Sequence, residues 1–432
     1  MSTSRTDELT DRIIGFLQKM GWYYEYRKQN NYIYSFAGAD GRAADAGGRA
    51  PRLEYVVCPG NTVYNVYTLC PLRARNPQEM DRMAEFVCRA NHSYPFGNLE
   101  LDYHDGEIRF RTCVVYERPE DVSDRMIADS FRNATDFFRC YGDALYQTLL
   151  GSITPKKAAA AGSRIYHQLL RESGAPDLSK RKETAKRITE NLEQNNWKYE
   201  YREQQNEIIS YATTEGRFQR LIYRIEICDA VYNIYALCPL KARTPKEKAD
   251  LAEFLCRANY GFRFGNYEMD PDTGEISYRA CVAFENSSDI RPAVMMESFR
   301  VTSAFFIRYE EGLLRVLLGA MEPAAAVMLC EQAPPSLEQM PETEKNTADG
   351  EDAEEGREEH EKEAEAEPDQ DAEAEEALQE PDGDEAEGGS AQTPINLLTA
   401  DLLQFLREQQ QDPEDGQPSS SEEDRDPESF DF

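Results

Sequence analysis

The sequence contains one pattern twice, and this repeat limits the fold more than any other feature. Residues 69–117 and 237–285 align without a gap at an offset of 168, and 27 of the 49 aligned positions are identical. Upstream, residues 22–27 match residues 197–202 at an offset of 175. A Gly- and Ala-rich stretch, residues 38–50, accounts for the difference and is interpreted as a longer surface loop in the first copy.

Each copy shows the same order of periodic segments. In the first copy a helical stripe of Leu9, Ile13, Phe16, Leu17 and Met20 comes first. Runs rich in Tyr, Val and Ile then predict strands at residues 22–29, 32–36, 53–58 and 62–70. A second helix begins at a cap followed by proline, and an Asp-Gly turn joins two further strands. The last helix has the strongest period and spans residues 127–149 in one copy and 295–317 in the other.

This order predicts the α+β class, with two tandem helix–antiparallel sheet–helix domains of order α-β-β-β-β-α-β-β-α. The first domain is expected at residues 5–150 and the second at 181–325. Residues 151–180 are expected to be a linker, in which Ile165, Leu169 and Leu170 allow a short helix. A disordered acidic tail is expected at residues 326–432.

The net charge of −33 belongs almost entirely to the tail. Residues 331–432 hold 36 acidic and 5 basic side chains, whereas the first 330 residues hold 45 and 43. The near-neutral body argues against a nucleic-acid partner, which would need clustered Lys and Arg. No apolar run approaches the roughly 20 residues of a membrane helix. Residues 1–11 lack a signal-peptide pattern, so we expect a cytoplasmic protein with no membrane partner.

One apolar island interrupts the acidic tail. Residues 394–408 follow a capping Thr393 and place Leu398, Leu402, Phe405 and Leu406 on one helical face. An isolated helix of this length is marginal in water, so a docking role would explain the apolar face. A chance cluster without a partner is the competing interpretation.

No residue pattern indicates catalysis, a cofactor or a metal. The ten cysteines include no Cys-x-x-Cys pair, and none of the four histidines is repeated in the other copy. Nucleotide-binding and hydrolase glycine motifs do not occur. The repeated acidic pairs Glu100/Asp102 and Glu268/Asp270 alternate with apolar residues, which predicts a solvated sheet face rather than an acid–base pair.

Two repeated sets of side chains could serve recognition. Tyrosines of the first strands, represented by Tyr24, Tyr26, Tyr199 and Tyr201, offer a protein-docking face or pack under helices. The arginines at positions 27/202, 89/257 and 111/279 could pair with the glutamates at 25/200 or 85/253, or bind an acidic partner, and we expect structural ion pairs.

The string from Thr244 to Asn259, followed by Phe264-Gly-Asn and the Asp270 to Ile276 turn, resembles the YbjN-like domain family. The first copy resembles it at Asn91, at Phe96-Gly-Asn and at the Gly106-Glu107 turn. In these strings the glycines fit positive-φ turns, and Asn91 and Asn259 fit helix ends.

The resemblance covers residues 5–150 and 180–320 and implies a fold like that of type III secretion chaperones. It implies protein binding, as a chaperone or a regulator, and no catalytic residues. We therefore expect a non-catalytic protein-binding module, monomeric because its two copies pair within the chain. An enzyme with an unrecognised site is the alternative.

Overall fold

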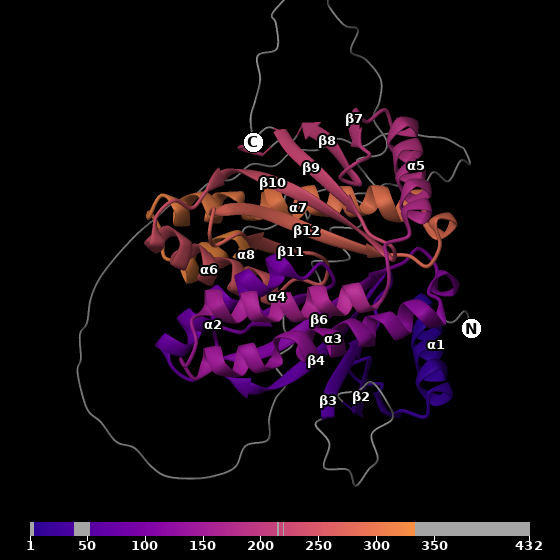
Figure 1. Ribbon diagram of the computed structural model, residues 1–432, viewed down its shortest axis with the longest axis horizontal. Coiled ribbons are helices and arrows are strands. Elements are labelled where there is room, and N and C mark those ends of the chain that lie inside the picture. The colour runs from indigo at the N-terminus through magenta and orange to yellow at the C-terminus, as the bar shows by residue number, and fades with distance from the viewer. Residues whose placement is uncertain (1–3, 39–51, 214–215, 219, 333–432) are drawn as a thin grey trace, which may run out of the picture.

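The computed structural model describes residues 4–38, 52–213, 216–218 and 220–332, which form two units of similar architecture (Figure 1). The first unit opens with a capped helix and a four-strand run, continues with a helix and a hairpin, and closes with two helices. Its elements are α1 (Arg5–Lys19), β1 (Tyr23–Arg27), β2 (Tyr32–Gly38), β3 (Arg52–Cys58), β4 (Val63–Arg73), α2 (Pro77–Ser93), β5 (Asn98–Leu101), β6 (Glu107–Val115), the 3₁₀ turn η1 (Pro119–Asp121), α3 (Asp124–Leu149) and α4 (Pro155–Glu172).

The second unit repeats this order element for element. Its elements are α5 (Leu178–Gln194), β7 (Tyr199–Arg202), β8 (Glu207–Thr213), β9 (Arg220–Ile227), β10 (Val231–Lys241), α6 (Pro245–Tyr260), β11 (Asn266–Met269), β12 (Glu275–Ala283), η2 (Ser287–Asp289), α7 (Pro292–Leu317) and α8 (Pro323–Gln332). The predicted caps are present, since Asn76 accepts from the amide of Glu79 and Thr244 from that of Glu247.

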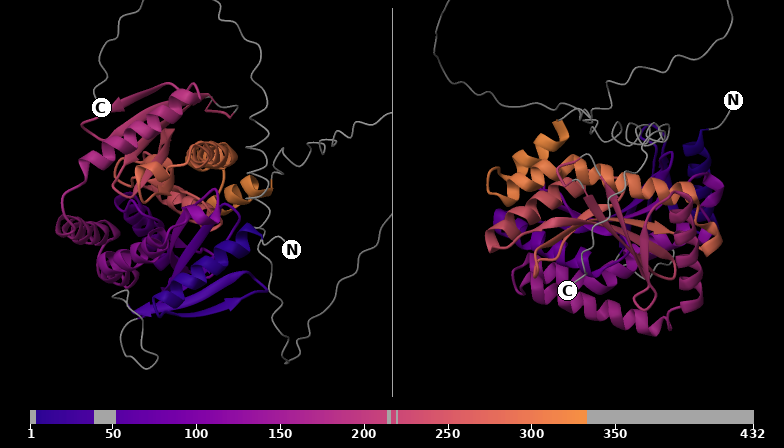
Figure 2. Two further views of the ribbon diagram at one scale, coloured as in Figure 1. Left: turned by 90° about the vertical axis from the view of Figure 1, so that its right-hand side faces the viewer. Right: turned by 90° about the horizontal axis from the view of Figure 1, so that it is seen from above.

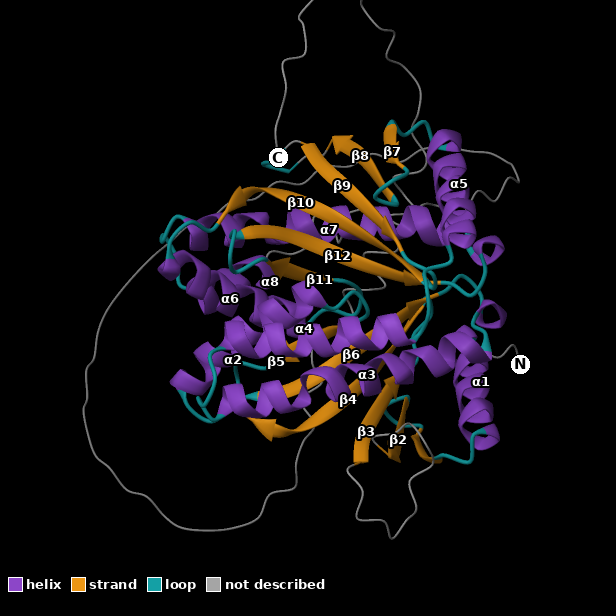
Figure 3. Cartoon of the chain, in the orientation of Figure 1, coloured by secondary structure: helices purple, strands orange, loops and turns teal. Residues whose placement is uncertain are grey.

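Each unit contains one six-stranded antiparallel sheet, in the orders β1-β2-β3-β4-β6-β5 and β11-β12-β10-β9-β8-β7. The predicted α+β class with two helix-covered antiparallel sheets is therefore confirmed (Figure 3). The long helices α3 and α7 cover one face of their sheets, which we call the inner face. The strands β5, β6, β11 and β12 bring the opposite, outer faces of the two sheets together.

The inner face carries the core because strand alternation and helix periodicity place their apolar side chains there. Tyr55 stacks edge-on against Phe131 of α3, and its phenol hydrogen-bonds Thr135 at 3.1 Å. The same arrangement occurs in the second unit, where Tyr223 meets Phe299 of α7. The helical stripes predicted from the sequence thus face the sheets.

The segment expected to be a linker differs from that expectation. Residues 155–172 of this segment form the helix α4, which packs on α2 and α3 instead of spanning open solvent. Its buried side chains include Ala158, Ala159, Gly162 and Tyr166, whereas Ile165 and Leu170 are exposed. The sequence interpretation relied on the large apolar residues of this segment. The side that packs is instead formed largely by small residues, which allow two helices to approach closely. The helix α8 is the equivalent addition to the second unit, packed on α6 and α7.

The loop predicted at residues 38–50 and the whole apolar island of the tail lie outside the described residues, apart from Gly38 at the end of β2. In the described part of the chain, none of the helices combines the length and the apolar character that crossing a bilayer requires.

Candidate functional site

The repeated polar residues meet at the seam between the two units. Arg111 on β6 is buried, and its Nε lies 2.5 Å from Oε1 of the buried Glu100 on β5. Its Nη2 donates a hydrogen bond of 2.7 Å to the carbonyl of Gly265 in the second unit. Burial alone would lower the pKa of Arg111, but the Glu100 carboxylate outweighs it and the pKa lies above its usual value.

The second unit returns the same contact. Arg279 on β12 pairs with Glu268 at 2.6 Å, and its Nη2 donates to the carbonyl of Gly97 at 2.7 Å. Both arginines and both glycines are separated by 168 residues, which is the offset of the repeat. Each unit thus donates an arginine hydrogen bond and accepts the equivalent one from the other unit. Reciprocal contacts of this kind are typical of two-fold interfaces, and here both partners belong to one chain.

The loop before β5 and its equivalent before β11 aim these carbonyls. Gly97 has φ +71° and Gly265 has φ +65°, a left-handed conformation that glycine adopts without strain. A Cβ on Gly97 would lie 2.5 Å from the Arg111 carbonyl oxygen. The next residue, Asn98, donates from Nδ2 to Oε1 of Glu100 at 3.0 Å. The Phe-Gly-Asn string therefore assembles the seam.

The asparagines of the preceding helices have a role that differs from the helix-end role we predicted. The Asn91 amide bonds both backbone groups of Leu99, accepting from N–H at 2.6 Å and donating to C=O at 2.9 Å. Asn259 holds Tyr267 in the same way, at 2.7 and 2.9 Å. Each side chain replaces a missing neighbouring strand, so β5 and β11 are fastened to α2 and α6. The sequence could not show this because the partner atoms are backbone atoms.

The predicted solvated face of the Glu100/Asp102 and Glu268/Asp270 pairs is wrong for the glutamates. Glu100 is 1% exposed and Glu268 3% exposed, whereas the two aspartates are half-buried. The alternation itself is correct, but the second unit covers the polar face and arginines neutralise it. The alternation of residues along one strand cannot show that another unit will cover its polar face.

The outer part of the seam is less symmetric. Arg109 pairs with Glu100 at 2.7 Å, donates to the Tyr260 carbonyl at 2.9 Å and lies 3.7 Å over the Tyr260 ring. Asp272 accepts from Arg89 and Lys156 of the first unit at 3.0 and 2.9 Å. These cations hold the pKa of Asp272 below its usual range, Lys156 most strongly.

The predicted ion pairs are also present: Arg27 with Glu25, Arg202 with Glu200, Arg89 with Glu85 and Arg257 with Glu253. Their expected structural role is confirmed.

Little in this arrangement suits bond-making chemistry. The neighbouring Cys88 thiol of the first unit, together with burial, raises the pKa of Cys256 well above its usual value. Burial also raises the pKa of Cys281 to about 12. Thiols of this kind are poor nucleophiles at neutral pH. Among the residues that the structure describes, no three His, Cys, Asp or Glu side chains converge as a metal site would need.

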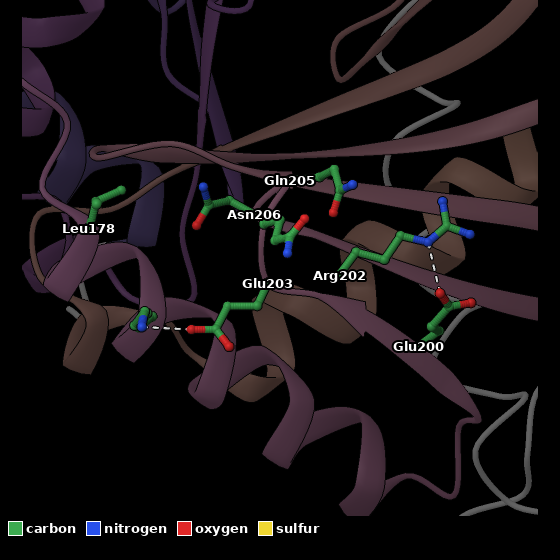
Figure 4. A pocket seen from close by; sticks show the side chains of 8 residues that line it. Leu178, Glu200, Arg202, Glu203, Gln205 and Asn206 are labelled. Atoms are coloured by element: carbon green, nitrogen blue, oxygen red, sulfur yellow. Dashed lines mark hydrogen bonds and ion pairs between the residues drawn. The ribbon is translucent and has the colours of Figure 1, made fainter.

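An open hollow of about 880 Å³ lies beside the β7–β8 turn and the start of α5 (Figure 4). Its charged walls are neutralised locally, because Lys182 pairs with Glu203 at 2.6 Å and Arg202 with Glu200 at 2.9 Å. Leu178 forms an apolar rim, and the remaining lining residues are Gln204, Gln205 and Asn206. The hollow offers amides and paired charges but no nucleophile, so it suits recognition better than catalysis.

The four tyrosines proposed for docking lie on the inner faces of edge strands. Tyr24 accepts from Gln18 of α1 at 2.7 Å, and Tyr199 donates to Glu193 of α5. Tyr26 and Tyr201 are likewise half-buried, beside the core. Exposed apolar side chains of the outer faces are Tyr23, Tyr211 and Ile222. The structure thus brings the tyrosines against helices, and Leu398, Leu402, Phe405 and Leu406 lie outside the described residues.

Comparison with known proteins gives a family match over part of the chain. No curated protein and no solved structure matches the chain. Residues 184–313 match the family model YbjN, described as "Putative bacterial sensory transduction regulator". The match runs from α5 into α7 and includes Asn259, Gly265, Glu268 and Arg279, the residues that build one side of the seam. Over residues 184–313, therefore, this chain is similar to the YbjN family.

Proposed function

We propose that this chain is a non-catalytic protein-binding regulator in which two YbjN-like domains pair within one chain. The proposed domains are residues 5–150 and 181–325, extended by the packed helices α4 and α8. The observation that carries the proposal is the use of the shared motif: its glycines, asparagines and charged residues hold the two units together. A regulatory role agrees with the family description for residues 184–313.

The first unit is assigned to the same family on two grounds. It shares 27 of 49 aligned residues with the matched unit, and its elements follow in the same order. The YbjN-like resemblance implies a fold like that of type III secretion chaperones, which pair as dimers. The reciprocal Arg111 and Arg279 contacts supply such a pairing within one chain, and we expect the protein to be monomeric.

Protein binding needs a surface, and the chain offers two kinds. One is the exposed apolar positions on the outer sheet faces, Tyr211 and Ile222 among them. The other is the apolar island of the tail, with Leu398, Leu402, Phe405 and Leu406. Tyrosine and leucine side chains of this size can supply the anchors of an interface.

The test is a cross-linking capture in cell extract, followed by binding of the purified candidate to the purified chain. We expect a protein that binds the wild-type chain and binds the Leu402→Asp/Phe405→Asp or the Tyr211→Asp/Ile222→Asp variant at least tenfold more weakly. The matched control is Leu318→Asp, an exposed apolar position at the end of α7. A purified chain that turns over a small molecule, with no protein bound saturably, would establish the enzyme alternative instead.

A further inference from the structure

The helix α4 presents an unoccupied side to solvent at the junction of the two units. Its small residues face α2 and α3, and its other side exposes Ile165 (46%) and Leu170 (42%). After five intervening residues, α5 begins with Leu178, which is 58% exposed and forms the rim of the open hollow. Figure 1 shows α4 in front of the junction, leading toward α5, and Figure 2 shows it on a different side of the molecule from α8.

This surface is the basic part of a near-neutral body. Residues 155–187 contain nine Lys and Arg and three Asp and Glu, a formal charge of +6, although Lys156, Arg181 and Lys182 pair with carboxylates outside this stretch. The rest of residues 1–330 carries −8. No ion pair in the described part of the chain involves Lys157, Arg164 or Arg171. We call the exposed residues Lys157, Arg164, Ile165, Leu170, Arg171 and Leu178 the α4–α5 strip.

Other exposed apolar positions differ in their surroundings. Leu318 and Met328 are close in the chain to the exposed Glu322 and Glu331. The exposed Tyr211 ring is covered by the Arg220 guanidinium at 4.2 Å from the ring centre. The α4–α5 strip combines three exposed apolar side chains with three cations that enter no ion pair in the described part of the chain.

The C-terminal segment of the same chain has the complementary character. It combines one apolar helical face, Leu398, Leu402, Phe405 and Leu406, with a tail that carries −31 over residues 331–432. From residue 332 to residue 393 the chain has 61 residues, and a flexible chain of that length spans about 43 Å on average. A connection of this kind gives an effective concentration of order 1 mM, so a weak contact suffices.

We propose that residues 394–408 dock as an amphipathic helix on the α4–α5 strip of their own chain. Leu402 and Phe405 cover Ile165 and Leu170, and acidic residues flanking the helix lie against Lys157, Arg164 and Arg171. This inference rests on the proposed function and adds a way in which partner binding is regulated. The segment that would bind a partner is held on the body, and a partner must compete with that intramolecular contact.

The experiment is hydrogen–deuterium exchange of the full-length chain, read by mass spectrometry on peptides covering residues 394–408. With an intrinsic Kd of about 0.1 mM, docking slows exchange of these amides about tenfold relative to the tail on either side. The tail variant Leu402→Asp/Phe405→Asp and the strip variant Ile165→Asp/Leu170→Asp should each abolish the protection. The matched control Leu318→Asp/Met328→Asp, also at exposed positions, should leave it unchanged.

Each other outcome overturns the inference. Exchange of residues 394–408 at the rate of the flanking tail means that no docking occurs. Protection that survives Ile165→Asp/Leu170→Asp means that the receiving surface lies elsewhere. Protection that rises with protein concentration, with a doubled mass in light scattering, means that the tail occupies a second copy.

The proposed function is measured separately by partner binding. The strip variant should bind a partner of the tail about tenfold more tightly than the wild-type chain, since the competing contact is lost. If the tail is unprotected but the chain still binds its partner, only the intramolecular docking is ruled out. If the tail is protected but the chain binds no other protein, only the proposed function is ruled out.

Discussion

Arg111 and Arg279 lie 168 residues apart in the sequence, and each donates a hydrogen bond to the backbone of the unit that contains the other. Each is also neutralised by a glutamate on the neighbouring edge strand of its own unit, Glu100 or Glu268. The seam therefore carries two equivalent buried charge pairs. Buried pairs of this kind are costly to break, because the remaining charge stays uncompensated in a dry environment.

The first prediction follows from these pairs and from the one difference between them. Arg279→Ala should lower the free energy of unfolding by about 3–5 kcal/mol, since it leaves the buried Glu268 without a cationic partner. Arg111→Ala should lower it by less, because Arg109 still pairs with Glu100. Chemical denaturation followed by circular dichroism measures the change. Arg27→Ala breaks an exposed pair with Glu25 and serves as the control, with an expected loss of about 1 kcal/mol or less. Equal effects of all three substitutions would contradict a buried role.

Much of the fold could be predicted from the sequence, because its signals are local. Alternating Tyr, Val and Ile runs placed the strands of the first unit within a few residues, and the stripe through Phe131 placed α3. The elements of the second unit could be predicted from those of the first by adding the offset of the repeat. Local periodicity decides these elements, so no knowledge of distant contacts was needed.

The seam could not be predicted in the same way. Glu100 has the pattern of an exposed strand residue, and only the second unit, more than 150 residues away in the chain, buries it. Asn91 has the position of a helix end, yet its partner is the backbone of a strand. In α4 most of the buried positions besides Tyr166 are alanine and glycine, which a search for large apolar residues overlooks. In each case the deciding contact is long-range.

The second prediction concerns thiol reactivity at the seam. Burial raises the pKa of Cys281 to about 12 and also raises that of Cys113. At about pH 8 a thiol of pKa 12 is ionised about 1000-fold less than an ordinary thiol, so we expect both to resist alkylation in the native protein. Mass spectrometric mapping after timed iodoacetamide treatment measures this. Arg111→Ala should accelerate labelling at both positions, and rapid labelling of the wild-type protein at either would contradict the buried seam.

The third prediction tests the packing of α4. A Cβ on Gly162 would overlap the ring of Tyr141, so Gly162→Leu should displace α4 and lower the free energy of unfolding by about 1–3 kcal/mol. Ala160→Leu lies on the exposed side of the same helix and should change it by about 0.5 kcal/mol or less. Thermal unfolding compares the two variants. Similar melting temperatures would show that α4 is not packed as described.

The fourth prediction concerns the domain boundaries. We expect limited proteolysis to remove the acidic tail first, leaving a fragment that ends near residue 332. A second, slower cleavage is expected at residues 173–177, between α4 and α5, instead of throughout residues 151–180. Intact-mass measurement of the fragments locates both cuts. Early cleavage within α4 would restore the interpretation of that segment as an open linker.

The fifth prediction concerns pH and the outer part of the seam. The pKa of Asp272 lies below its usual value of about 3.9, chiefly through Lys156 and Arg89 of the first unit. A carboxylate with a lowered pKa stabilises the folded state above about pH 3.9, and this contribution disappears as the pH falls through the lowered value. Asp272→Asn should therefore reduce stability at neutral pH by a small amount, because the group is largely exposed.

The difference between wild type and Asp272→Asn should shrink to nothing at acid pH, and denaturation curves at several pH values between about 2 and 7 measure it. Asp105→Asn is the matched control, since the lowered pKa of Asp105 arises within the first unit, from the backbone of Glu107 and from Arg73. Both substitutions should show the same pH dependence, but only Asp272→Asn should loosen the contact between the units. That loosening is read as faster hydrogen exchange at the α6–β11 loop. An Asp272 effect that persists unchanged below about pH 2 would show that Lys156 and Arg89 are not its partners.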